Sequence, residues 1–155
     1  MKNLLLILIL FFTACSVKNY EKTETKIIII KTQKLKFADL GYIRSKGDAL
    51  ELELFVAGKS VFRVAFDSDI CTHDGCMSRA AFNAEYLVAA YPDELLQNII
   101  LGKAIYDGVY VKKTEDGFEQ YLKNSHVDII YKVSKNEIYF KDAKNTILIK
   151  IKESK

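Results

Sequence analysis

The sequence is poor in several residue types that reveal chemistry when they are abundant. Its 155 residues include no tryptophan, one proline and two histidines, His73 and His126. The G-x-S-x-G, H-E-x-x-H and phosphate-loop patterns are also absent, and these patterns carry the catalytic groups of large enzyme classes. We interpret His126 as a turn residue ahead of a strand. We therefore expect a protein that is not an enzyme and that needs no cofactor.

Charge of one sign is also lacking. The 23 lysines and arginines are interspersed with 20 acidic residues, which leaves a net charge of +3. Proteins that bind nucleic acid gather their basic residues into a patch or stripe, so we exclude nucleic acid as a partner. Tyrosine and phenylalanine make up the 12% aromatic share and isoleucine is abundant, a composition that favours strands. The length leaves room for one domain.

The chain has no apolar run of transmembrane length. Its N-terminal run covers only residues 4–12, whereas a membrane-spanning helix needs roughly 20 apolar residues. A short run behind Lys2 is typical of a signal peptide. The following residues 12–15, Phe-Thr-Ala-Cys, resemble the bacterial lipobox, and the resemblance implies cleavage after Ala14 and lipidation of Cys15. The alternative is an ordinary secretory signal with an incidental cysteine.

Lipidation of Cys15 would decide where the protein resides. Two or more acyl chains hold a protein on a membrane almost permanently. Ser16 follows the cysteine in place of aspartate, which by the sorting rule of enteric lipoproteins implies the periplasmic face of the outer membrane. We therefore divide the chain into a signal peptide over residues 1–14, a lipidated cysteine with a polar, flexible tether over 15–26, and a domain over 27–155.

Most of the domain has the patterns of β-strands. From Ala49 the residues alternate, with leucines on one face and Glu51 and Glu53 on the other, which is typical of an antiparallel sheet with one covered side. Turn residues separate such segments, including the Asp-Gly pair at residues 116–117. We expect about nine strands, near residues 27–30, 35–43, 49–56, 61–67, 109–113, 118–123, 127–133, 137–141 and 146–152.

A helical insert interrupts the strands between residues 66 and 106. Ser78 can cap a helix over residues 79–87. Pro92 can begin a second helix, with the acidic residues 93 and 94 in its first turn, where they meet the positive end of the helix dipole. Helical spacing gives this second helix one apolar stripe, formed by Leu95, Leu96, Ile99 and Ile100.

Two cysteines remain once Cys15 is assigned to lipid. Cys71 and Cys76 form an even pair in an exported chain, and we expect a disulfide between them. Because its loop is short, the chain-entropy account gives it only about 2 kcal/mol of stabilisation. The alternative is a metal site that adds His73 and Asp74, although a second ligand pair at zinc-finger spacing is lacking. The spacing also differs from the C-x-x-C of redox sites.

The order of these elements resembles the family of lipoprotein carriers similar to LolA and LolB. The resemblance rests on the lipobox, on the helical segment YPDELLQNIIL at residues 91–101 between two runs of strands, and on the closing strands from residue 127 to 151. It covers most of the mature chain. It implies an α+β fold, in which a strongly curved antiparallel sheet forms an open half-barrel and a two-helix insert covers its concave face and encloses acyl chains.

Two functions follow for such a domain. The first is binding of the acyl chains of a lipid or lipoprotein in an apolar cavity, as part of lipoprotein localisation. Burial of apolar area at about 25 cal/mol per Å² would supply the affinity. The second is a structural or scaffolding role toward envelope proteins, with a packed core and no ligand. For the first, the expected cavity residues are Leu50, Leu52, Leu54, Phe62, Val64, Phe66, Leu95, Leu96, Ile99 and Ile100.

Overall fold

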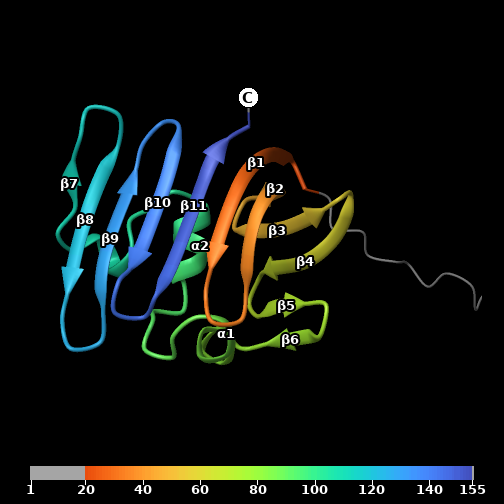
Figure 1. Ribbon diagram of the computed structural model, residues 1–155, viewed down its shortest axis with the longest axis horizontal. Coiled ribbons are helices and arrows are strands. Elements are labelled where there is room, and N and C mark those ends of the chain that lie inside the picture. The colour runs from red at the N-terminus through yellow and green to blue at the C-terminus, as the bar shows by residue number, and fades with distance from the viewer. Residues whose placement is uncertain (1–19, 155) are drawn as a thin grey trace, which may run out of the picture.

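A single antiparallel sheet of eleven strands organises the protein (Figure 1). The computed structural model describes residues 20–154. The predicted signal peptide, Cys15 and the first part of the tether lie outside the described residues. The strand order is β6-β5-β4-β3-β2-β1-β11-β10-β9-β8-β7, so β6 and β7 form the two edges and the sheet stays open. The expected α+β fold with an open antiparallel sheet is therefore confirmed.

The strands follow one another as a meander in each half of the sheet. The N-terminal half contains β1 (Lys22–Lys31), β2 (Lys36–Lys46), β3 (Ala49–Val56), β4 (Lys59–Phe66), β5 (Ile70–Thr72) and β6 (Gly75–Met77). The C-terminal half contains β7 (Lys112–Lys113), β8 (Phe118–Lys123), β9 (Asp128–Val133), β10 (Glu137–Asp142) and β11 (Ile147–Glu153). The two halves join where β1 pairs with β11, with Ile28 opposite Ile151 and Ile30 opposite Ile149.

The predicted number of strands, nine, is wrong because a hairpin was missed. β5 and β6 lie within the segment that holds the two cysteines, where short polar residues hide the strand pattern. The predicted strand over 109–113 is reduced to β7, because a 3-10 turn, η2 (Tyr106–Gly108), and a loop precede it. The first strand begins at Lys22, so the end of the predicted tether belongs to the sheet, where β2 and β11 pair with it.

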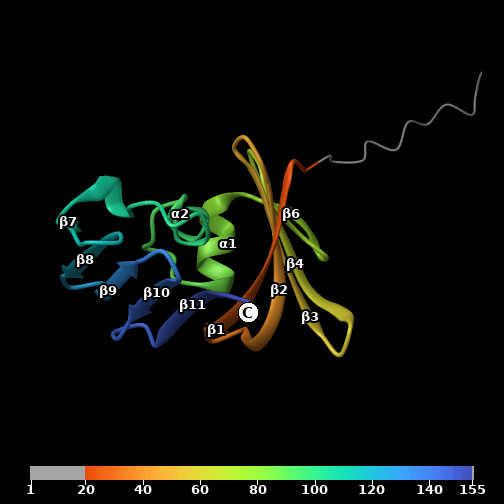
Figure 2. The ribbon, with the colours of Figure 1, turned by 90° about the horizontal axis from the view of Figure 1, so that it is seen from above.

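The sheet bends so that its inner side surrounds the helical insert (Figure 2). Two local features favour bending within the N-terminal half. Gly41 of β2 lies so close to its neighbours that an added Cβ would be 2.6 Å from Cδ1 of Ile28. A register shift between Leu54 and Phe55 interrupts the pairing of β3 with β4, and such bulges increase twist and bend the strand.

Two short helices fill the inside of the bend. In α1 (Arg79–Tyr86), the Ser78 side chain accepts a hydrogen bond from the backbone N–H of Ala81, as the sequence predicts. The second helix, α2 (Leu95–Ile100), begins three residues after Pro92, so the predicted start was too early. Residues 92–94 form a turn in which the backbone N–H of Leu95 donates to the Pro92 carbonyl.

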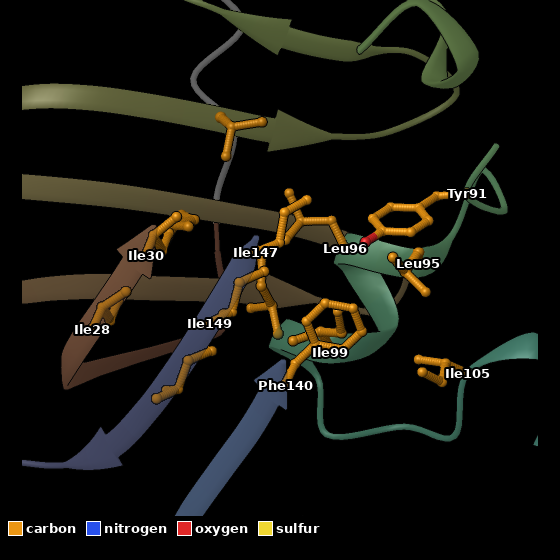
Figure 3. Packing of buried hydrophobic residues seen from close by; sticks show 14 of the residues in the cluster. Ile28, Ile30, Tyr91, Leu95, Leu96, Ile99, Ile105, Phe140, Ile147 and Ile149 are labelled. Atoms are coloured by element: carbon orange, nitrogen blue, oxygen red, sulfur yellow. The ribbon is translucent and has the colours of Figure 1, made fainter. Parts of the chain in front are cut away.

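The hydrophobic core lies between the helices and the inner face of the sheet (Figure 3). Figure 3 shows Leu96 beside Ile147 and Ile149 of β11, and Ile99 beside Phe140 of β10. These side chains are at most 6% exposed. Their burial at about 25 cal/mol per Å² is the main favourable term that holds the helices to the sheet.

Candidate functional site

The candidate site is the inner face of β3 and β4 together with the helices that cover it. The predicted residues of the two strands pair across the sheet, with Leu52 opposite Val64 and Leu54 opposite Phe62. All ten predicted cavity residues are buried, with exposed fractions from 0% to 8%. Their place in one apolar core is therefore established, whereas their contact with a ligand stays a prediction.

Only some of these residues share a cavity. A small apolar cavity lies between α1, α2 and the sheet, and its walls include Leu52, Phe62 and Val64 of the strands and Leu96 of α2. The remaining predicted residues pack elsewhere in the same core. The cavity volume is about 20 Å³, which is room for about one water molecule. Pockets for small ligands usually measure about 300–1,000 Å³, so the concave face is filled by the protein's own side chains.

Helix α1 forms the outer wall of this cavity through two aromatic residues. Phe82 is 1% exposed and stacks on Tyr86, with ring centroids 4.7 Å apart. Tyr86 in turn meets Phe62 of β4 at 5.8 Å. Phe82 and Tyr86 are four positions apart and therefore lie on one face of the helix. This i,i+4 aromatic pair was the available sequence signal for α1, although neither residue was predicted to line the site.

The polar contacts of α1 lie at its rim. Near its C-terminal end, Glu85 pairs with Lys34 of the β1–β2 turn at 2.6 Å, and the Lys34 ammonium also lies 5.4 Å from the Tyr86 ring centroid. The hydrogen bond to Glu85 raises the pKa of Lys34. Both side chains of the pair are about half exposed, so the contact is weak and sensitive to salt.

The other end of α1 is held by hydrogen bonds to loops and to α2. Arg79 donates to Oε1 of Gln97 at 2.8 Å and to the backbone carbonyl of Asp67 at 2.6 Å. The buried Asn83 donates to the carbonyls of Tyr91 and Pro92, which ties α1 to the segment that leads into α2. These contacts join α1 to its sequence neighbours, and the side of α1 that faces the sheet is apolar.

A larger hollow opens at one end of the concave face. Its volume is about 220 Å³, and its floor includes Ile100 of α2 with Ile43, Ile138 and Ile151 of the sheet. Its rim carries charged residues in pairs, such as Lys26 with Glu153 at 2.5 Å. Ile100 belongs to the predicted cavity residues, so the hollow borders the apolar core, although it shares no lining residue with the small cavity beneath α1.

The cysteine pair forms the predicted disulfide. Cys71 and Cys76 face each other across the β5–β6 hairpin and are bonded. Both sulfur atoms are engaged, and His73 at the hairpin tip is 63% exposed and lies 3.2 Å from the adjacent Asp74 carboxylate. No group of three or more potential metal ligands comes together within residues 20–154. The bridge fixes the hairpin that leads directly into α1.

The outer face of β3 differs from the sequence expectation. The alternating pattern placed Glu51 in solvent, but this residue is 2% exposed. It accepts hydrogen bonds from Arg44 at 2.7 Å, from Arg63 at 2.8 Å and from the hydroxyl of Tyr20 at 3.1 Å. Two guanidinium groups therefore compensate the buried carboxylate.

Comparisons of the chain with protein families, with curated proteins and with solved structures found no match. Within residues 20–154, the helices are too short and too polar to cross a membrane.

Proposed function

We propose that the protein binds acyl chains of a lipid or lipoprotein on the concave face of its sheet, beneath α1. In this proposal it is a lipoprotein, held by Cys15 at the periplasmic face of the outer membrane, and it serves lipoprotein localisation. The LolA/LolB-like order of elements in the sequence supports the same function. The ligand would make no covalent bond, because apolar contact alone supplies its affinity.

The observation that carries this proposal is the way in which α1 covers the sheet. The helix meets the sheet through Phe82 and Tyr86, and its polar side chains contact the β1–β2 turn, the Asp67 loop and the segments around α2 instead of the inner face of the sheet. The backbone hydrogen bonds of α1 are satisfied within the helix or at its cap, and Asn83 ties the helix to the carbonyls of Tyr91 and Pro92. In this proposal α1 swings away from β3 and β4 while the Asn83 hydrogen bonds are kept, so that no backbone group is left unpaired. An acyl chain can then take the place of the two aromatic rings.

The size of the closed cavity makes the proposal specific. About 20 Å³ holds no acyl chain, so binding requires α1 to move outward. The hollow of about 220 Å³ beside Ile100 supplies an entry next to the apolar interior. Ligand binding should therefore expose α1 to hydrogen exchange and protease, while the strands beneath it stay protected.

The test is native mass spectrometry with lipid extraction on the full chain released from membranes in mild detergent. A bound lipid or acyl peptide, together with uptake of a fluorescent fatty acid, is the expected result. Leu96→Glu places a charge in the cavity wall and should abolish uptake. Leu40→Glu is the matched control, because Leu40 is 46% exposed on β2. Equal uptake by both variants would contradict binding on the concave face.

A second function is favoured by the filled interior itself. A scaffolding lipoprotein needs a rigid domain with a packed core, and the concave face is packed. Such a protein would be empty after purification and would not take up an added fatty acid. The same experiment therefore separates the two functions.

A further inference from the structure

An apolar tip projects from the end of the molecule farthest from β3 and β4. The tip consists of Val109, Tyr110 and Val111, which are 44%, 77% and 38% exposed. It lies between η2 and the edge strand β7, at the β7 end of the long axis in both ribbon views (Figures 1 and 2). Tyr110 is the most exposed large apolar residue among those described. Exposed apolar residues in one group mark interaction sites.

The backbone of this segment adopts conformations that bulky residues rarely occupy. Tyr106, Asp107 and Tyr110 have φ angles of 48°, 54° and 57°. A left-handed conformation is costly for residues with a Cβ atom, and such strain gathers at functional sites.

A buried glutamine holds the strained segment in place. Gln120 of β8 is fully buried, and its side-chain amide makes hydrogen bonds in both directions. Its Oε1 accepts from the backbone N–H of Ile105 at 2.9 Å, and its Nε2 donates to the carbonyls of Ile105 and Val109 at 3.0 and 2.7 Å. Gln120 therefore holds the N-terminal side of the tip, and the pairing of β7 with β8 holds the residues that follow it.

We propose that the Val109–Tyr110–Val111 tip inserts into the interfacial region of a lipid bilayer. Three side chains fall far short of the roughly 800 Å² per partner that a stable protein interface buries. A bilayer sets no such minimum, because each buried CH₂ contributes independently to insertion. Tyrosine is enriched at membrane interfaces, where its ring and its hydroxyl meet apolar and aqueous surroundings.

The charges around the tip are consistent with insertion driven by apolar contact. Lys112 and Lys113 follow it directly, and lysines near a membrane can extend their ammonium groups to the headgroups. Asp107 and the acidic pair at residues 115–116 lie nearby in the sequence, and Lys112 approaches Glu119 at 3.7 Å. Because the two signs are balanced, insertion should depend little on anionic lipid or on salt.

The absence of tryptophan makes the test direct, because one substitution introduces a unique fluorophore. The full chain with Tyr110→Trp is reconstituted into vesicles of phosphatidylcholine, and separately into vesicles that add phosphatidylglycerol. Insertion should shift its emission to shorter wavelength, and lipids brominated along the acyl chain should quench it, in both kinds of vesicle. The matched control is Tyr121→Trp, because Tyr121 is 48% exposed on β8 and should keep an aqueous spectrum.

A third variant separates insertion from simple proximity. Val109→Asp combined with Val111→Asp changes exposed side chains and should abolish quenching of the Tyr110→Trp fluorophore while leaving the fold intact. Insertion is excluded if brominated lipid leaves the Tyr110→Trp emission unchanged, or if it quenches Tyr121→Trp equally. A spectral shift that requires an added membrane protein would also overturn the proposal. None of these outcomes depends on a ligand beneath α1.

Discussion

The two halves of the sheet hold their inner coverings in different ways. In the C-terminal half, polar side chains on the inner face bind the segments that cross it: Gln120 holds residues 105–109, the Tyr131 hydroxyl donates to the Lys103 carbonyl at 2.9 Å, and Asp142 accepts from Tyr91 at 2.7 Å. In the N-terminal half, the inner face of β3 and β4 is apolar, and the buried charge of Glu51 lies on the outer face.

Because of this difference, we expect the segments that cover the C-terminal half to be rigid and the helix that covers the N-terminal half to be mobile. Hydrogen bonds to buried polar groups are directional, and breaking them leaves buried atoms unpaired. Apolar contacts can be exchanged for other apolar contacts at little cost. The C-terminal half should therefore stay closed, while the helix that covers the N-terminal half can exchange its aromatic contacts for those of a ligand.

The largest expected effects come from removing one phenylalanine in each half. Phe140 is fully buried between Tyr91 and Tyr131, whose ring centroids lie 6.3 and 6.2 Å away. Phe140→Ala should lower the free energy of unfolding by about 4 kcal/mol, near the middle of the range for such cavities. Phe82→Ala should cost about 3 kcal/mol, because α1 can move into the vacated space.

Urea denaturation of the two variants measures this comparison. Phe82→Ala should also speed uptake of a fluorescent fatty acid, whereas Phe140→Ala should not. A larger loss of stability for Phe82→Ala than for Phe140→Ala would show that α1 is held as firmly as the C-terminal half.

A smaller effect is expected from Asp142, through pH. Burial disfavours the charge, but the hydrogen bonds from Tyr91, Asn145 and the backbone outweigh it, so the pKa of Asp142 is lowered. Burial and the nearby carboxylate of Asp142 raise the pKa of Tyr91. A lowered carboxyl pKa stabilises the fold above the unfolded value of about 3.9, and this stabilisation is lost as the pH falls through the folded value.

Asp142→Asn should therefore cost about 2 kcal/mol at neutral pH, the worth of hydrogen bonds to a charged group. The difference in the free energy of unfolding between this variant and the unmodified chain should shrink below about pH 4. Denaturation curves at several pH values measure this. The matched control is Asp39→Asn, at an exposed position of β2, which should leave stability at neutral pH nearly unchanged. If Asp142→Asn lowered the free energy of unfolding by the same amount at every pH, the result would contradict a charged Asp142 carboxylate in the folded protein.

The smallest expected effect on stability concerns the ion pair between Lys34 and Glu85. Glu85→Ala removes a half-exposed contact, so the urea midpoint should stay the same within error. A loss of about 0.5 kcal/mol would let the helix open about two-fold more often, so uptake of a fluorescent fatty acid should become at most about two-fold faster. Glu21→Ala is the matched control, because Glu21 forms a similar ion pair with Lys46, with a distance of 3.5 Å, and this pair does not involve α1. Equal uptake by the two variants would show that the pair does not hold α1.

The sequence was sufficient to predict the antiparallel sheet, the helical insert and the disulfide. Regular alternation in β3 and the stripe in α2 determine which residues are buried, because one face of each element must leave water. The same reasoning placed Glu51 in solvent, since alternation alone does not reveal that Arg44 and Arg63 from neighbouring strands surround the carboxylate.

The segment before β7 could not be predicted for a similar reason. Val109 and Val111 alternate with Tyr110 as in a strand, and the strand prediction followed from that local pattern. The conformation is instead set by Gln120, which belongs to β8 and bonds to Ile105 and Val109. Hydrogen bonds between residues that are separated by a turn, such as Gln120 and Val109, leave no periodic pattern in the sequence. The small size of the cavity was likewise invisible, because it depends on how Phe82 and Tyr86 pack.

The pairing of β1 with β11 has a consequence for the order of folding. Each half of the sheet is a meander of neighbouring strands, so its hairpins can form from local contacts. The joint in the centre of the sheet pairs residues 26–31 with residues 148–153, which are separated by most of the chain. Contacts of such long range form slowly. The central joint should therefore close last, and the edges of β1 and β10 that pair with β11 stay open to aggregation until β11 has been made.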